Sequence, residues 1–420
     1  MRFVLVTTGS LGDVQPFLAL AVGLRQAGYV VRLAGPQDAG ELAERYGVEF
    51  YPIDKDHQER LAGEPVSGSL EGGNTLRFGW QRMQAKRRIF QAVNRAAWQA
   101  CQGAEAILYR IGGYLAVDSM AEKLRVPCFK AGLVPYTPTS EFPNLRVFRG
   151  RDFGEPGNRL SYCLAEQAVW QFFRPEINEF RSAVLGLPQY PLSGPRPGDF
   201  TSRLPVLYGF SPALLPPPAD WPANVFVTGQ WELEQADGWQ PPGDLLDFLA
   251  AGPPPVYVGF GSMISQAPGD TYELICRALR SCGRRGVLAS GWGGLAGTAD
   301  PSGQIYTLEY APHGWLFPQM AVVVHHGGIG TTTNGLKAGI PNIIVPFNYD
   351  QPFWGEMVFR RGAGPRPIPR KGLTADRLAE AIESALNDAA MRQRAAEIGQ
   401  RIRQEDGVAI AIKIILHNIL

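Results

Sequence analysis

The stretch from Met320 to Pro346 constrains the fold of this chain most, because a strand, a glycine-rich turn, a helix and a second strand follow one another within it. Met320–Val324 and Asn342–Pro346 are the apolar segments that we predict to be strands. Strands joined by a helix at this short spacing are typical of a parallel sheet covered by helices. The stretch therefore predicts an α/β fold.

The turn in this stretch has the composition of an anion-binding site. Gly327, Gly328 and Gly330 allow the backbone to approach a ligand closely. The following helix opens with a run of threonines, Thr331–Thr333, and the first amides of a helix have no partner within it. Together with the helix dipole these groups suit a phosphate, and His326 can donate a hydrogen bond to one of its oxygens.

Asp350 and Gln351 follow the second strand and suit a different part of a ligand. A carboxylate only accepts hydrogen bonds, whereas an amide both donates and accepts them. Such a pair matches hydroxyls presented at fixed angles, as on a sugar ring. Phosphate at one end and hydroxyls at the other describe a nucleotide sugar.

The start of the chain has a similar order of elements. Phe3–Thr7 and Val30–Ala34 are expected strands, and we expect Pro16 to open the helix between them, because proline near the first helical position loses no hydrogen bond. A chain of 420 residues is long for one hydrophobic core, so we expect two doubly wound, Rossmann-like domains. The expected boundaries are 1–211 for the first domain, 212–223 for a proline-rich linker, 224–404 for the second domain, and about 405–420 for a helix that docks back on the first domain.

Several spaced motifs resemble the donor signature of inverting GT-B glycosyltransferases. They are Tyr310-Ala311-Pro312-His313, His325-His326-Gly327-Gly328-Ile329-Gly330-Thr331-Thr332, Ala338-Gly339-Ile340-Pro341 and Asp350-Gln351. The sequence is most similar to sterol glucosyltransferases and to bacterial enzymes that glycosylate natural-product aglycones. The resemblance implies two Rossmann-like domains that face each other across a cleft, with the acceptor on the first and the nucleotide sugar on the second.

The resemblance also implies a set of donor-binding residues. We expect the donor to contact Ser10, Gly261, Ser262, Trp292, Tyr310, His313, His326, Gly328, Gly330, Thr331, Thr332, Asp350 and Gln351. Trp292 equally suits ordinary packing. Asn334 stands where many relatives carry a glutamate that binds the ribose hydroxyls, so the choice between a UDP-sugar and a dTDP-sugar stays open. Similarity to the sterol branch favours UDP-glucose.

Asp13 is the expected catalytic base, because this sequence has no histidine in the first turn where many relatives carry one. The alternative is that Asp13 merely caps the helix expected to start at Pro16. His57, in the polar segment Asp54–Thr75, is the second candidate base. No carboxylate pair stands beside the phosphate site to hold Mg²⁺, so we expect no metal and no cofactor beyond the nucleotide-sugar co-substrate.

The acceptor site is expected to be mostly apolar. A lipophilic alcohol, such as a sterol or a polycyclic aglycone, needs apolar area and one hydroxyl near the base. The candidates are Val134, Tyr136, Phe142, Trp170 and Phe173. The same residue types also suit a domain core.

Composition excludes several other classes of protein. The net charge of +1 argues against a nucleic-acid partner. Five cysteines without a CxxC pair favour reduced thiols and a cytoplasmic location. The opening segment does not have the pattern of a signal peptide, and no stretch is apolar for the 18 or so residues of a membrane span. The apolar stretch Val408–Leu420 is expected to be a docking helix, with peripheral membrane contact as the alternative.

Two other functions share the expected fold. A nucleotide-sugar epimerase would need a carboxylate-rich sugar site and no lipophilic pocket. A non-catalytic auxiliary protein would lack transfer, and the presence of Asp13, His326 and Asp350-Gln351 argues against it. Among glycosyltransferases, a dTDP-sugar-dependent natural-product enzyme is the alternative to a UDP-glucose enzyme.

Overall fold

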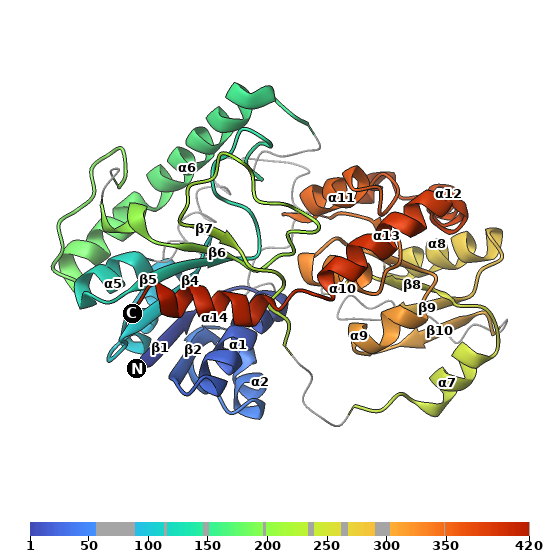
Figure 1. Cartoon of the computed structure of the whole chain (residues 1–420), viewed down its shortest axis with the longest axis horizontal. Helices are drawn as coiled ribbons and strands as arrows, with labels where there is room; N and C mark the ends of the chain where they lie inside the picture. Colours follow the sequence, from blue (N-terminus) through green and yellow to red (C-terminus); the bar gives the residue numbers. More distant parts are fainter. Residues whose placement is uncertain are drawn as a thin grey trace, which may run out of the picture.

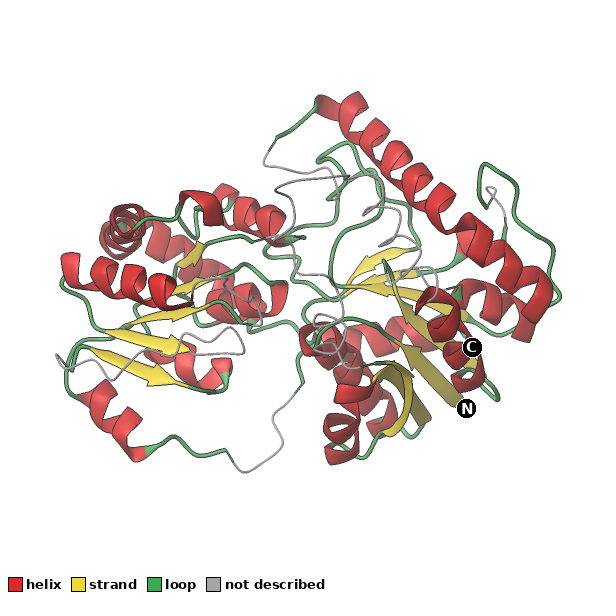
Figure 2. Ribbon diagram, turned by 180° about the vertical axis from the view of Figure 1, so that it is seen from behind, coloured by secondary structure: helices red, strands yellow, loops and turns green. Residues whose placement is uncertain are grey.

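The structure is a computed structural model of the chain, and it describes residues 1–55, 89–112, 116–145, 151–195, 199–233, 239–261, 268–289, 303–347 and 349–419. Within these residues two parallel sheets, each flanked by helices, form two halves of the molecule (Figure 1). Seen from behind, both chain ends lie in the same half (Figure 2). The predicted α/β fold with two Rossmann-like domains is confirmed.

The first sheet has seven parallel strands in the order β3-β2-β1-β4-β5-β6-β7. Its strands are β1 (Arg2–Val6), β2 (Val30–Pro36), β3 (Glu49–Asp54), β4 (Ala106–Arg110), β5 (Cys128–Gly132), β6 (Val206–Tyr208) and β7 (Val225–Val227). The strand order reverses between β1 and β4, which pair in a register that places Leu5 opposite Leu108. Ligands of open α/β sheets bind beyond the carboxyl ends of the strands at such a reversal.

The second sheet has five parallel strands in the order β10-β9-β8-β11-β12. They are β8 (Val256–Gly259), β9 (Gly286–Ala289), β10 (Ile305–Leu308), β11 (Val322–His325) and β12 (Asn342–Ile344). The order reverses between β8 and β11, and their register places His325 opposite Gly259. This second reversal therefore lies where the glycine-rich turn begins.

Helices and helical turns surround both sheets. In the first half they are α1 (Leu11–Gln26), η1 (Gln37–Ala39), α2 (Gly40–Arg45), helical residues 89–100, α5 (Val117–Leu124), α6 (Gly154–Glu179), η3 (Phe180–Val184) and η4 (Phe200–Arg203). Those that follow are α7 (Gly243–Ala250), α8 (Pro268–Ser281), α9 (His313–Leu316), η5 (Phe317–Gln319), α10 (Ile329–Lys337), α11 (Gln351–Arg360), η6 (Arg370–Gly372), α12 (Ala375–Asn387), α13 (Ala389–Ile402) and α14 (Gly407–His417). No described helix is both long and apolar enough to cross a membrane.

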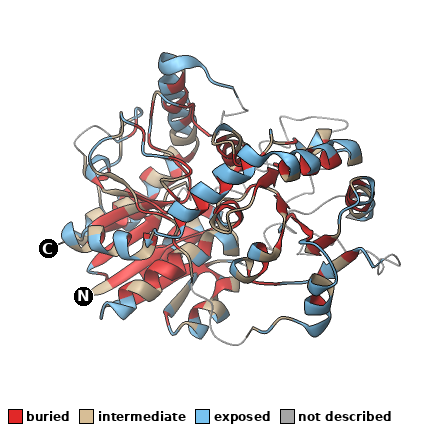
Figure 3. Cartoon of the chain, turned by 45° about the vertical axis from the view of Figure 1, so that its right-hand side comes forward, coloured by how far each residue is buried: buried red, intermediate tan, exposed pale blue. Residues whose placement is uncertain are grey.

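The central strands are buried on both faces, as expected of a parallel sheet between helices. Phe3 and Leu5 of β1 pack in the cluster that includes α1, whereas Val4 and Val6 pack in the cluster that includes α5. This alternation follows from the two-residue period of a strand. Figure 3 shows buried strands in both sheets and exposed outer faces of the surrounding helices.

Helix α1 begins five residues earlier than the sequence predicted. Ser10 is its N-cap residue and Leu11 its first helical residue, so Pro16 lies inside the helix. A proline this close to the start removes only the hydrogen bond to the carbonyl of Gly12. The prediction that Pro16 opens the helix was therefore wrong, because the capping residues determine the start.

The proline-rich segment 212–223 joins two strands of the first sheet. It connects β6 to β7, and these strands pair with each other. Leu214 and Leu215 are buried, and the Trp221 ring packs against Tyr208 at 5.2 Å between centroids. The first sheet therefore extends past the predicted boundary at Asn224, since proline content indicates irregular backbone and not the end of a domain.

Helix α14 returns to the first half of the molecule and packs against α1. A Cβ atom at Gly23 would lie 2.6 Å from Val408 Cγ1 and 2.7 Å from Ile412 Cδ1, so glycine lets the two helices approach closely. The connection before α14 is held by Ser211, whose hydroxyl donates to Glu405 Oε1 at 2.6 Å. The end of the chain therefore completes the core of the first domain.

Two isoleucines of α14 provide a matched test of this docking. Ile415 is fully buried and Ile410 is 42% exposed. Ile415→Ala should lower the free energy of unfolding by about 2–5 kcal/mol, because it removes buried methyl groups and leaves a cavity. Ile410→Ala should change it by less than about 0.5 kcal/mol. Urea-induced unfolding of both variants checks this, and equal losses would contradict the docking.

Candidate active site between the two sheets

The carboxyl end of β4 in the first sheet lies near the start of α11 in the second domain. Arg110 closes β4, and it interacts electrostatically with Asp350, the N-cap residue of α11. The rings of Phe142 and Phe353 also meet across the domains, at 5.1 Å between centroids. The two domains therefore bring together charged groups from the strand-order reversal of the first sheet and from the loop after β12 in the second domain.

Asp13 lies at the third position of α1 and closes its first turn. The Ser10 backbone N–H and hydroxyl donate to Asp13 Oδ2 at 2.9 and 3.1 Å. A Cβ atom at Gly9, where φ is +118°, would lie 2.3 Å from the same oxygen, so only glycine leaves room for the carboxylate. Asp13 thus helps to cap a helix, which was the alternative to a catalytic role, although this helix starts at Leu11 and not at Pro16. The Asp13 side chain is still 28% exposed, so capping does not prevent contact with a ligand.

Arg110 is a site residue that sequence reasoning missed. One of its guanidinium nitrogens donates to Asp13 Oδ1 at 2.7 Å. Burial lowers the pKa of the guanidinium, but the charges of Asp13, Tyr136 and Asp350 raise it by more, so its pKa lies above the ordinary value. An arginine at the end of the apolar segment Ala106–Tyr109, next in space to β1, was the available signal.

His325 and His326, adjacent in sequence, have different roles. His325 is fully buried, its Nδ1 accepts from the Gly327 backbone N–H at 3.1 Å, and its Nε2 donates to Asn342 Oδ1 at 2.8 Å. Burial lowers the pKa of His325 to about 3, so the ring is neutral and ties the turn to β12. His325 therefore fixes the backbone from which His326 projects.

The His326 ring is held between two glycines that follow β8 and β11. A Cβ atom would lie 3.1 Å from the ring at Gly261 and 2.6 Å from Nε2 at Gly328. Burial lowers the pKa of His326 to about 4, which makes the ring neutral near pH 7. Its Nδ1 is buried without a hydrogen-bond partner among the described residues. A neutral ring with an unused nitrogen can still donate one hydrogen bond to a ligand.

The remaining donor-binding candidates differ in how exposed they are and in whether their side chains are already hydrogen-bonded within the protein. Thr332 is buried and its hydroxyl donates to the Gly328 carbonyl at 2.9 Å, whereas Gly330 is exposed and Thr331 is partly exposed. Gln351 is buried, and its Oε1 accepts from the Phe347 backbone N–H at 2.8 Å. Thr332 therefore stabilises the start of α10, and Gln351 stabilises the loop after β12.

The candidates around the nucleobase are only partly described. Tyr310 is 63% exposed, and the His313 ring stacks on Phe317 at 4.3 Å between centroids. Burial lowers the pKa of His313 to about 4. Ser262 and Trp292, like the second candidate base His57, lie outside the described residues.

Asp350 is the second carboxylate of the site. Its Oδ2 accepts from Trp354 Nε1 at 2.9 Å. Burial raises the pKa of Asp350 to about 6, and the charge of Asp13 contributes to this rise. The preceding Tyr349 has a φ of +55° and is 82% exposed, a conformation that costs a residue with a side chain about 1–2 kcal/mol. Backbone strain of this kind is frequent at functional sites.

Of the five acceptor-site candidates, Tyr136 lies beside the charged groups. It interacts electrostatically with Arg110, and its ring would lie 3.1 Å from a Cβ atom at Gly112. Val134 and Phe142 are buried in the core cluster that includes α1, and Phe173 is buried with its ring stacked on Phe90 at 5.1 Å between centroids. Trp170 packs against Tyr190, and its indole donates to the Leu192 carbonyl. These four have the packing contacts that were the alternative to an acceptor role.

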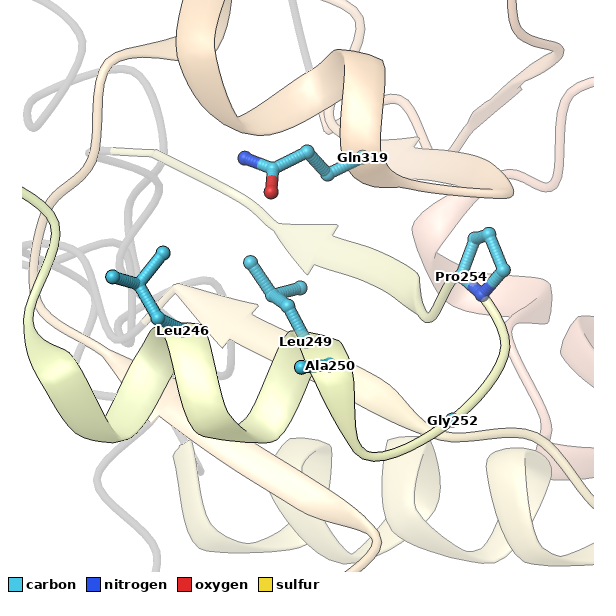
Figure 4. A pocket seen from close by; sticks show the side chains of 6 residues that line it. All are labelled: Leu246, Leu249, Ala250, Gly252, Pro254 and Gln319. Atoms are coloured by element: carbon cyan, nitrogen blue, oxygen red, sulfur yellow. The ribbon is translucent and has the colours of Figure 1, made fainter.

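A separate apolar depression lies on the second domain between α7 and η5 (Figure 4). It is lined by Leu246, Leu249, Ala250, Gly252, Pro254 and Gln319. None of these side chains can exchange a proton near neutral pH, so the depression does not compete with the site between the sheets. Within the described residues no group of three or more His, Cys, Asp and Glu side chains could hold a metal ion.

Comparison with known proteins identifies the family. Residues 3–143 match the glycosyltransferase family 28 N-terminal domain, and residues 295–407 match the erythromycin biosynthesis protein CIII-like C-terminal domain. The sterol 3-beta-glucosyltransferases UGT80A2 and UGT80B1 of Arabidopsis thaliana are 38% and 36% identical over 98% of this chain. The chain belongs to their glycosyltransferase family. It spans 65% and 67% of the lengths of these two relatives, about two thirds.

Solved structures agree with this family at the level of the fold. The kitacinnamycin glycosyltransferase is 20% identical, with a TM-score of 0.71 over 100% of this chain and 99% of that one. The glycosyltransferase VinC, solved in complex with dTDP, is 16% identical, with a TM-score of 0.67 over 99% of this chain and 100% of that one. This family member therefore has the GT-B fold.

Two glycines of the turn give a matched test of how His326 is held. An alanine Cβ at Gly328 would collide with the ring, whereas one at Gly330 would meet no atom within 4 Å. Gly328→Ala should lower the free energy of unfolding by about 1–3 kcal/mol through overpacking. Gly330→Ala should leave it unchanged or raise it by up to about 1 kcal/mol, because alanine favours a helix. Thermal unfolding without ligand measures both, and a stable Gly328→Ala variant would contradict this packing.

The raised pKa of Asp350 predicts a pH-dependent stability. The ordinary pKa of 3.8 rises to about 6 on folding, so between these values the folded chain binds more protons than the unfolded chain. The contribution of Asp350 to the free energy of unfolding therefore falls as pH rises through this window. Asp350→Asn keeps an oxygen for Trp354 and should stabilise the protein by about 1–2 kcal/mol at pH 7.5. The difference should vanish near pH 4, and an equal difference at both pH values would refute this explanation.

Proposed function

We propose that this chain is an inverting, metal-independent glycosyltransferase that moves a hexose, glucose in the first place, from a UDP-sugar to a hydroxyl of a lipophilic acceptor. A sterol or a polycyclic aglycone is the expected acceptor. The observation that carries the proposal is the electrostatic interaction of Asp13, in the first turn of α1, with Asp350, at the start of α11 in the other domain. The sterol glucosyltransferase relatives support the same assignment.

Asp13 serves as the base in this proposal. Its carboxylate takes the proton of the acceptor hydroxyl while the oxygen forms a bond to the anomeric carbon of the sugar. The bond from that carbon to the diphosphate breaks, and the diphosphate leaves with the electron pair. A single displacement of this kind inverts the configuration of the anomeric carbon.

The leaving diphosphate is stabilised by the start of α10 and by His326. The first amides of α10 face a ligand where negative charge develops, which is where hydrogen-bond donors accelerate a reaction. His326 adds a neutral donor, so the charge is balanced by backbone dipoles and one ring N–H. Asp350, ionised above its pKa of about 6, accepts hydrogen bonds from sugar hydroxyls near pH 7.

The choice of donor nucleotide depends on Asn334 in this proposal. An asparagine binds a ribose hydroxyl without the charge assistance of glutamate. A dTDP-sugar is therefore the alternative donor, and VinC in its dTDP complex is one neighbour of this fold that fits it. Tyr310, His313, Ser262 and Trp292 remain proposed contacts of the donor.

A cytoplasmic location and peripheral membrane contact complete the proposal. All five cysteines are free, which suits a reducing compartment. A membrane would supply a lipophilic acceptor, and Tyr136 beside Arg110 is the acceptor-side residue that we propose first. No nucleic-acid partner is proposed.

A product assay tests the proposed function. The chain would be incubated with UDP- and dTDP-sugars against sterols, polyphenols, macrolides and hydrophilic alcohols, with and without EDTA, and products identified by mass spectrometry. We expect one hexose on a lipophilic alcohol, from UDP-glucose, with EDTA present. Transfer only to hydrophilic acceptors, strict dependence on a divalent ion, or epimerised nucleotide sugar without transfer would each overturn part of the proposal.

Asp13→Asn separates catalysis from helix capping. Asparagine keeps one oxygen that can accept from Ser10 but takes no proton, so transfer should fall about 10²–10⁴-fold while UDP affinity stays within about twofold. Asp388→Asn is the matched control, since Asp388 caps α13 through its side chain. It should leave transfer unchanged. Turnover of Asp13→Asn close to wild type would exclude Asp13 as the base.

A further inference from the structure

Arg110 makes a contact that neither the fold nor the capping of α1 requires. The cap is complete through Asp13 Oδ2, which accepts both the N–H and the hydroxyl of Ser10. Arg110 binds the other oxygen, Oδ1, from a strand 97 residues further along the chain. β4 is already held by its pairing with β1 and β5. The ion pair is therefore an addition at the carboxyl end of the sheet.

The hydrogen bonds of Asp13 identify which of its oxygens is free to react. An ionised carboxylate oxygen accepts about two hydrogen bonds. Oδ2 already accepts two from Ser10, whereas Oδ1 accepts one from Arg110 at 2.7 Å. A proton from an acceptor hydroxyl would therefore go to Oδ1, next to the guanidinium.

Two carboxylates and one guanidinium share this place. Asp13 and Asp350 interact electrostatically, and each also interacts with Arg110. Two carboxylates alone would repel each other, and a buried guanidinium alone would pay a large desolvation cost. The side chains of Arg110 and Asp13 are only 20% and 28% exposed, so salt and water screen their pairing less than at a surface. When Asp13 takes a proton and loses its negative charge, the negative charge of Asp350 still balances the positive charge of Arg110.

We infer that Arg110 is a positioning residue of the transfer reaction: it holds Asp13 Oδ1 toward the acceptor hydroxyl, places a positive charge beside that carboxylate, and connects it to Asp350 on the donor side. The inference rests on the proposed function. Arg110 itself does not accept a proton or bind the transferred sugar. Its loss should change how transfer depends on pH, which a merely structural residue would not do.

The test compares the pH profiles of kcat/KM for the wild type, Arg110→Met and Arg110→Lys. Without the cation, protonation should inactivate the base at higher pH, so the acidic limb of Arg110→Met should move up by about one to two pH units. In Arg110→Lys the acidic limb should return close to its wild-type position, because lysine restores the positive charge. The kcat should stay below that of the wild type, because lysine lacks the planar guanidinium group that orients the carboxylate. UDP affinity should stay within about twofold in both variants.

Neighbouring groups and a second ion pair provide the controls. Asp13 from α1, Asp350 from α11 and Tyr136 from the loop after β5 are the titratable groups that interact with Arg110. Arg110→Met should still shift the acidic limb when it is combined with Asp350→Asn, because the shift is assigned to Asp13 and not to Asp350. Arg159→Met breaks another arginine–aspartate pair of the first domain, at 2.8 Å, and should not move the limb.

A measurement without substrate separates this inference from the proposed function. The ¹³C signal of the Asp13 carboxyl, assigned with Asp13→Asn, would be titrated in the wild type and in Arg110→Met. We expect its midpoint to rise by about one to two pH units in the variant. An unchanged midpoint, or an acidic limb that stays in place while kcat falls equally at every pH, would overturn the inference and leave the proposed function standing. Absence of transfer by the wild type would instead overturn the proposed function.

Discussion

The ion pair between Arg110 and Asp13, with Asp350 beside it, is the interaction on which the rest of the site depends. Arginine and aspartate are costly to bury unless they are paired, and Arg110 interacts both with Asp13 of its own domain and with Asp350 of the other. The first domain supplies Arg110 from the end of β4 and Asp13 from the first turn of α1, and the second domain supplies Asp350. The charges thus connect two folding units at the place where α/β sheets bind ligands.

Close backbone packing provides the second constraint. Gly9 leaves space for Asp13, and Gly261 and Gly328 leave space for the His326 ring. Neutral, buried His325 ties the same turn to β12. These contacts fix the turn before any ligand arrives, which lowers the cost of ordering it when a diphosphate binds. Tyr349, with its positive φ, shows that some backbone strain remains beside Asp350.

Local sequence pattern predicted the strands, the glycine-rich turn and the candidate residues Asp13, His326 and Asp350, because each is marked by residues next to it in the chain. The start of α1 was missed because Ser10 and Asp13 cap the helix before Pro16. Arg110 was missed because its partner lies 97 residues away, and only the sheet order brings them together. The segment 212–223 was misassigned because proline content does not show which strands pair on either side of it.

The central claim is that sugar transfer takes place between the carboxyl ends of β1 and β4 in the first sheet and those of β8 and β11 in the second. A crystal structure of the Asp13→Asn variant with UDP-glucose tests this claim most directly. The account predicts the diphosphate on the first amides of α10 within hydrogen-bond distance of His326. It also predicts the glucose hydroxyls at Asp350 and the anomeric carbon open toward residue 13. A diphosphate bound elsewhere, or a glucose turned away from residue 13, would contradict the account.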